Sequence, residues 1–171
     1  MEKIAWLVLG IATLVSAIVA QWRPAALPVG RLFLGVFYVV AGAVVHAIYL
    51  ATGASYAGFA DAAHVAFVRT AWHQVVAPHQ GFFIGLLILF EAVVGVLVLT
   101  GGRRAELGLL GILGMQACLL LFGWVLTGFA IVMLVAVGLL LRAQVRHDRA
   151  AAVTGRSGSH DRADGRGPVP V

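Results

Sequence analysis

The chain has 171 residues, of which 61% are hydrophobic and only 11% are charged. Soluble domains carry about 25% charged residues, so this composition argues against a soluble domain and predicts an integral membrane protein built as one compact bundle. The formal net charge is +5. Its arginines flank apolar runs instead of forming a basic patch with interleaved aromatics, which argues against a nucleic-acid partner.

Four apolar runs define the expected membrane spans, at residues 4–20, 32–51, 81–100 and 107–141. A span needs about 20 residues at a rise of 1.5 Å, so each of the first three fits one crossing. The fourth is too long for a hydrocarbon core of about 30 Å. Gly123, between two aromatics, is expected to break it into two short spans, roughly 105–122 and 126–141.

The arginines indicate the orientation of these five spans, because cytoplasmic loops carry an excess of positive residues. A cytoplasmic C-terminus leaves only Lys3 and Arg69 outside. The remaining basic residues then lie inside: Arg23, Arg31, Arg103, Arg104, Arg142, Arg146, Arg149, Arg156, Arg162 and Arg166. Residues 142–171 are expected to form a basic stripe at the membrane surface, suited to anionic headgroups, followed by a disordered tail from Val153.

The first apolar run, within residues 1–22, has two interpretations. A lysine before it and small residues near its end also fit a signal peptide. Trp6 and Trp22 bracket the run as interfacial aromatics do, which favours a retained membrane helix.

The long connection, residues 52–80, is predicted to lie outside and to contain an amphipathic helix that lies at the interface or caps the bundle. Asp61 is the expected N-cap of this helix, and Pro78 is expected to end it. Apolar residues recur on one face at helical spacing: Val65, Val68, Trp72, Val75 and Val76.

Glu91 lies in the middle of the run LLILFEAVVGVLVL, residues 86–99. A carboxylate at the centre of a membrane helix costs about 2.5–3.5 kcal/mol, so it is expected to face the bundle interior and to have a partner there. His46 and Gln116 lie at similar depths on two other spans. Further polar residues could extend the network: Tyr38, Tyr49, Thr127 and Ser16. This group has two interpretations: hydrogen bonds that hold the helices together, or a pocket that transfers a proton or binds a polar ligand.

The remaining candidates carry weaker signals. His64, His73 and His79 match no compact metal-ligand spacing, and a bis-histidine haem is disfavoured because only His46 lies within a span. Arg69 and His73 share a helix face at i, i+4 and could bind an anion at the mouth of a pocket, or be a solvated face. The single cysteine, Cys118, is expected to be a small packed hydrophobe.

One segment, FEAVVGVLVLTGGRR, resembles the second helix of the DoxX family of membrane proteins. The family pattern of Glu, Gly four residues later, an apolar stretch and then Gly and Arg corresponds to Glu91, Gly95, Gly101 or Gly102, and Arg103. An opening Arg31, Leu32 and Gly35, with Gly42 later, resembles the first family helix. The resemblance covers residues 31–141 and implies an all-α, four-helix core with residues 1–22 as an extra N-terminal span.

The resemblance implies a multi-pass protein of the bacterial inner membrane. Many family members carry a lysine late in the first helix, where this chain has His46. Some relatives are linked to sulfur oxidation, as in thiosulfate:quinone oxidoreductase, and others to membrane-associated oxidative-stress complexes.

Three functions stay open at this point. The first is a redox-linked subunit that binds quinone or a small sulfur species around Glu91 and works with a redox partner. The second is an accessory or scaffold subunit, alone or as a homo-oligomer, and the third is a proton-coupled carrier. Whether the chain is itself an enzyme also stays open.

Overall fold

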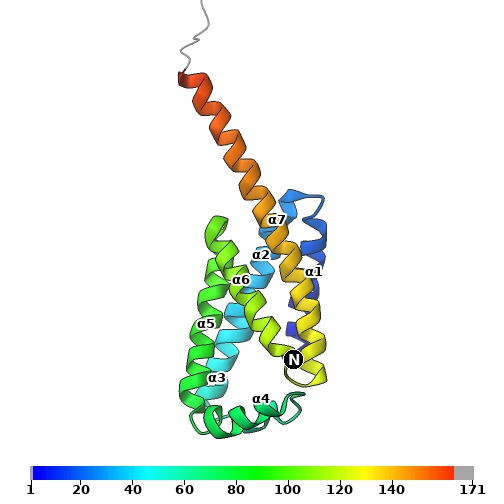
Figure 1. Ribbon diagram of the computed structural model, residues 1–171, viewed down its shortest axis with the longest axis vertical. Coiled ribbons are helices and arrows are strands. Elements are labelled where there is room, and N and C mark those ends of the chain that lie inside the picture. The colour runs from blue at the N-terminus through cyan, green and yellow to red at the C-terminus, as the bar shows by residue number, and fades with distance from the viewer. Residues whose placement is uncertain (1, 164–171) are drawn as a thin grey trace, which may run out of the picture.

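The computed structural model describes the backbone of residues 2–163 and the side chains of residues 6–152, and all regular structure in this part of the chain is helical (Figure 1). The elements in chain order are α1 (Glu2–Val19), η1 (Pro24–Ala26), α2 (Leu27–Val36), η2 (Phe37–Val44), α3 (Val45–Ala51), η3 (Ala57–Ala60), α4 (Ala66–Ala71), η4 (Trp72–Val76), α5 (Gln80–Thr100), α6 (Gly102–Leu119) and α7 (Trp124–Ala163). The prediction of an all-α protein is confirmed.

Three helical stretches of the described chain are long and apolar enough to cross a membrane: Pro24–Ala51, Gln80–Thr100 and Trp124–Ala152. Trp6–Val19 is a shorter apolar helix. The 18-residue α6 begins with two arginines and a glutamate, which lower the apolar character of its first turns. The coarse prediction of a membrane protein is therefore confirmed at the level of these three helices.

The last long apolar run is broken where glycine was expected to break it. Helix α6 ends at Leu119 and α7 begins at Trp124, with Gly123 buried between them. A Cβ on Gly123 would lie 2.7 Å from the Cβ of Ala62 in the long connection, so the absence of a side chain lets the connection lie directly on this turn.

Helix α7 is much longer than the predicted span. It continues through Ala163, so the structure differs from the predicted disorder over residues 153–163. Each residue added to an existing helix gains a backbone hydrogen bond, which lets a well-packed helix extend into a polar sequence. Residues 164–171 lie outside the described part of the chain.

The helices pack closely where glycines replace larger residues. Gly35 on α2 and Gly95 on α5 face each other, and a Cβ on either would lie 3.1 Å from the carbonyl oxygen of the other. Gly108 brings α6 onto α5, where a Cβ would lie 2.9 Å from the Val94 carbonyl. Small residues that allow backbones to approach are typical of helix contacts in membranes.

The long connection covers one end of the bundle, which we call the connection end and define by η3, α4, η4 and the α6–α7 turn (Figure 1). The backbone N–H of His64 donates to the Leu121 carbonyl at 3.2 Å, and the rings of Phe59 and Trp72 contact Phe122. A cap over the bundle was one of the two positions predicted for this segment.

The details of this cap differ from the prediction. Val65, and not Asp61, precedes α4, and no side chain caps the helix. Asp61 instead lies 2.9 Å from Nε2 of His73. Val65 and Val75 are 39% and 49% exposed, so the predicted apolar face is only partly covered. Trp72 faces the bundle, where its ring contacts Phe122. Its indole donates to the Tyr56 carbonyl of the connection at 2.8 Å.

The opposite end of the bundle, which we call the arginine end, is formed by residues 20–24, the α5–α6 turn at Gly101 and the part of α7 around residue 144. Arg31 donates through NH1 to Oε1 of the buried Gln144 at 3.0 Å. Gly101 adopts φ +80° beside this guanidinium, where a Cβ would lie 2.8 Å from NH1. The positive φ favours glycine here, and the missing side chain leaves room for the guanidinium.

Trp6 does not have the interfacial position predicted for it. Its indole donates to the Ala41 carbonyl at 3.1 Å, and its ring lies 6.1 Å from that of Phe37 inside the bundle. Helix α1 packs against α2 and α7, and its residues Thr13 and Ala17 are fully buried. Trp22, by contrast, is 75% exposed.

Candidate functional site

The candidate site is centred on Glu91, which projects from the middle of α5 into the bundle and is only 6% exposed. One carboxyl oxygen, Oε1, lies 3.7 Å from Nε2 of His46 on α3. The other, Oε2, is buried and has no hydrogen-bond partner among the described residues. A buried carboxyl oxygen without a partner is costly, so the retention of an acid at this position requires an explanation.

His46 connects the carboxyl group to the connection end. Its Nδ1 lies 2.9 Å from the hydroxyl of Tyr56, and the two rings lie 5.8 Å apart. Tyr56 is held by Gln80 at the start of α5, whose Oε1 accepts from the Tyr56 backbone N–H at 3.2 Å. Glu91, His46 and Tyr56 thus form a line of polar side chains from the interior of the bundle to the covering connection, with a gap of 3.7 Å between Glu91 and His46.

The backbone opposite Glu91 is a π-helix. Residues of η2 place Gly42 against the carboxyl group, and a Cβ at this position would lie 2.9 Å from Cδ and 3.0 Å from Oε1 of Glu91. A π-helix in a longer α-helix is rare and occurs frequently at functional sites. Here it combines with glycine to make room for an acid between two closely packed helices.

A second polar pair lies one turn away from Glu91 along α5. The hydroxyl of Tyr38 accepts from Nε2 of Gln116 at 2.8 Å, and both side chains are 1% exposed. A Cβ on Gly95 would lie 3.2 Å from that of Tyr38, which places this tyrosine directly against α5. Gln116 Oε1 is buried and has no hydrogen-bond partner among the described side chains and backbone.

The other predicted site residues are more exposed or belong to the connection. Tyr49 is 37% exposed on α3. Arg69 donates through NH1 to the Ala63 carbonyl at 2.6 Å, and His73 pairs with Asp61, so both fix the fold of the connection. The structure therefore groups Glu91 with His46, and Gln116 with Tyr38.

The main residue that sequence reasoning missed at this site is Tyr56. It lies in an irregular part of the connection, where no periodicity relates it to His46. An aromatic residue with a polar group between two glycines, Gly53 and Gly58, was the only available signal.

Two hollows in the surface lie outside this polar line. An open groove of about 510 Å³ runs between α5 and α6 and is lined by Phe83, Leu86, Leu87, Phe90, Leu110, Gly111, Gly114, Met115 and Cys118. Leu87 and Phe90 bring the groove to the middle of α5, but Glu91 is not among the residues that line it. Cys118 is exposed in this groove and is not the packed residue that was predicted.

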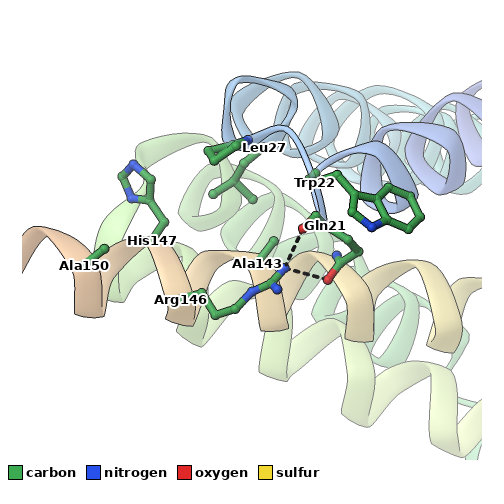
Figure 2. A pocket seen from close by; sticks show the side chains of 9 residues that line it. Gln21, Trp22, Leu27, Ala143, Arg146, His147 and Ala150 are labelled. Carbon is green, nitrogen blue, oxygen red and sulfur yellow. Dashed lines mark hydrogen bonds between the residues drawn. The ribbon is translucent and has the colours of Figure 1, made fainter.

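The second hollow is a cavity of about 270 Å³ at the arginine end, between α7 and the turn that follows α1 (Figure 2).

Comparison of the chain with protein-family models, with curated proteins and with solved structures gives no match.

Proposed function

We propose that the protein is a DoxX-like, redox-linked membrane subunit that binds a quinone or a small sulfur species next to Glu91. The observation that supports this function is the buried Oε2 of Glu91, which has no hydrogen-bond partner among the described residues and lies at the inner end of the line through His46 to Tyr56. Enzymes that oxidise or reduce quinones need both a place for the ring and a route for protons.

The polar line supplies the elements of such a route. Imidazole changes its charge near neutral pH, and its two nitrogens can accept a proton on one side and release it on the other. The 3.7 Å between His46 and Glu91 is too long for a direct hydrogen bond. A shift of about 1 Å in either side chain closes this distance to hydrogen-bonding range, which is a motion side chains make readily.

The groups present suit a quinone and its reduced form. Glu91 Oε2 can accept a hydrogen bond from a quinol hydroxyl, or donate one to a quinone carbonyl when the acid is protonated. The groove beside α5 is apolar along its length, as the prenyl tail of such a molecule requires. Bound quinone supplies two-electron chemistry, and the electrons come from a redox partner.

We further propose a five-span arrangement in the bacterial inner membrane, with α1 and α6 crossing beside the three longer helices. The arginine end then faces the cytoplasm and the connection end faces outside, as the positive-inside rule requires. Arg31, Arg103, Arg142 and Arg146 all belong to the arginine end, which supports this orientation.

The test is native mass spectrometry of the protein extracted gently from its own membrane, as wild type, Glu91→Gln and Glu106→Gln. Glu106 is the matched control because it is an acid in the first turns of α6, far from the polar line. A mass increment that matches a quinone is expected in wild type and Glu106→Gln, with at least tenfold lower occupancy in Glu91→Gln. Equal occupancy in all three proteins would contradict a role for Glu91.

A second candidate is a non-catalytic accessory subunit. It is favoured by the tight packing of the Glu91 carboxyl group against Gly42, which indicates an acid that fixes helix position. In this case the same experiment releases a second polypeptide and no small ligand, and Glu91→Gln loses the polypeptide.

A further inference from the structure

The cavity at the arginine end combines apolar walls with a basic rim. It is lined by residues from the end of α1, from η1 and α2 and from α7: Ala20, Gln21, Trp22, Pro24, Leu27, Ala143, Arg146, His147 and Ala150. Figure 2 shows Arg146 and His147 approaching it from α7, and Gln21 and Trp22 from the turn that follows α1. A hollow of this character suits a ligand that has an anionic group and an apolar body.

Arg146 is held in place and retains unused donors. Its NH2 donates to Oε1 of Gln21 at 2.8 Å, and Gln21 is itself fixed by donating from Nε2 to the carbonyls of Ala17 and Leu139, each at 2.9 Å. The guanidinium has five N–H donors, and NH1 and Nε bond to nothing in the described part of the chain. A positioned guanidinium with free donors is well suited to a phosphate.

The charges around the cavity favour an anion. Arg146 and His147 both line it, and the nearby acid, Asp148, is already engaged by Nδ1 of His147 at 3.4 Å and by Nε2 of Gln144, which donates to it at 3.0 Å. The helical stretch Pro24–Ala51 begins at the cavity, which places the positive end of its dipole there.

The position of the cavity along α7 matches a membrane surface. Ala143 lies 19 residues after Trp124, which corresponds to about 28 Å at 1.5 Å per residue. This is close to the hydrocarbon thickness of about 30 Å. Trp22, 75% exposed beside the cavity, has the interfacial position typical of tryptophan in membrane proteins.

We infer that this cavity binds the phosphate headgroup of an anionic phospholipid, with Arg146 as its main contact and the apolar wall of Leu27 and Ala143 against the upper acyl chains. The group recognised is a phosphate anion, which both a phospholipid headgroup and a soluble phosphate ester carry. The apolar wall and the depth of the cavity favour the lipid as the source.

The test uses the full chain in nanodiscs of phosphatidylcholine that contain about 10–20% phosphatidylglycerol, which gives the bilayer an anionic surface. The readout is the number of phosphatidylglycerol molecules retained in native mass spectra after controlled activation. Arg146→Gln is expected to lower retention of the last bound lipid by about fivefold, corresponding to one basic contact at a membrane surface. Arg142→Gln, one turn away on α7 and outside the cavity, is the control and is expected to change it by less than about twofold.

A second variant separates binding from the role of Arg146 in packing. Ala150→Phe is expected to fill the cavity while leaving Arg146 and Gln21 in place, and therefore to lower lipid retention as much as Arg146→Gln. Equal retention in Ala150→Phe and wild type, or equal losses in Arg142→Gln and Arg146→Gln, would overturn the site. Glycerol phosphate at about millimolar concentration is the soluble competitor. If it displaces the bound lipid, the site recognises the phosphate group alone, and a lipid is not its natural ligand.

Discussion

At the residue scale, the two oxygens of Glu91 have different surroundings. Oε1 is close to an imidazole, whereas Oε2 is buried in the bundle and makes no hydrogen bond within the part of the chain that the structure describes. Gly42 packs against the same carboxyl group from the neighbouring helix. The position of the acid is therefore controlled by the size of residue 42 as well as by its polar partner.

Gly42→Ala tests this control. The new Cβ would lie 2.9–3.0 Å from the carboxyl group and displace it, so quinone occupancy is expected to fall with Glu91 itself unchanged. Because the displaced atoms end a flexible side chain, the loss of unfolding free energy is expected near the lower end of the overpacking range, about 1 kcal/mol.

Gly85→Ala is the matched control, since a Cβ on Gly85 meets no atom within 4 Å and Gly85 lies on the same helix as Glu91. Native mass spectrometry and thermal unfolding measure the two effects. Unchanged quinone occupancy in Gly42→Ala would show that the acid does not need its present position.

Sequence reasoning reached part of this site. Glu91 and His46 stand out because polar residues at membrane depth are rare, and the structure places them 3.7 Å apart. The bonding of Gln116 to Tyr38, and the position of Tyr56 beside His46, depend on rotations of helices and on the path of an irregular connection. Neither leaves a periodic trace in the sequence.

At the scale of elements, glycine contacts determine how closely α5 approaches its neighbours. Gly35 and Gly95 bring α2 near α5, and Gly108 brings α6 near it. These contacts involve backbone carbonyls, which cannot move aside as a flexible side chain can.

Gly108→Val is expected to push α6 away from α5, because its Cβ would lie 2.9 Å from the Val94 carbonyl. The expected loss is about 1–3 kcal/mol of unfolding free energy, measured by chemical denaturation in mixed micelles. Gly114→Val, three residues beyond Gly111 on the same helix, is the control because Gly114 faces the open groove with no atom within 4 Å. Equal stability of the two variants would contradict a close α5–α6 contact.

The elements also explain two errors of prediction. The sequence of the connection indicated one amphipathic helix with Asp61 as its N-cap. The chain does form one uninterrupted helical segment, α4 followed by η4, but this segment begins only after Val65. Trp72 and Phe59 attach this segment to the bundle, and Asp61 pairs with His73. Tertiary contacts thus decided both the length of the helix and the role of the acid, and propensity alone could not predict them.

At the scale of the whole molecule, the two ends of the bundle differ in chemistry. The arginine end carries the guanidinium groups of Arg31 and Arg146 with their glutamine partners. The connection end is closed by aromatic contacts around Phe122. The proposed orientation in the membrane follows from this difference, because the basic end is placed on the cytoplasmic side.

Cysteine labelling tests the orientation directly. In a Cys118→Ala background, Ser55→Cys at the connection end is expected to react with a membrane-impermeant maleimide added to intact cells. Ala151→Cys on α7 is expected to react only after the membrane is opened. Labelling of both positions in intact cells would contradict five spans, because it would place the two ends on the same side.

The π-helix η2 also bears on how the length of this chain can vary. A π-helical turn holds about one residue more than an α-helical turn, and the flanking helices α2 and α3 keep their own regular geometry. Loss of one residue between Phe37 and Val44 can therefore be absorbed by closing the wide turn, with Arg31 and His46 left on their present faces. Length variation among related chains is expected to concentrate here, and a chain with the shorter form would lose the space that now holds the buried acid.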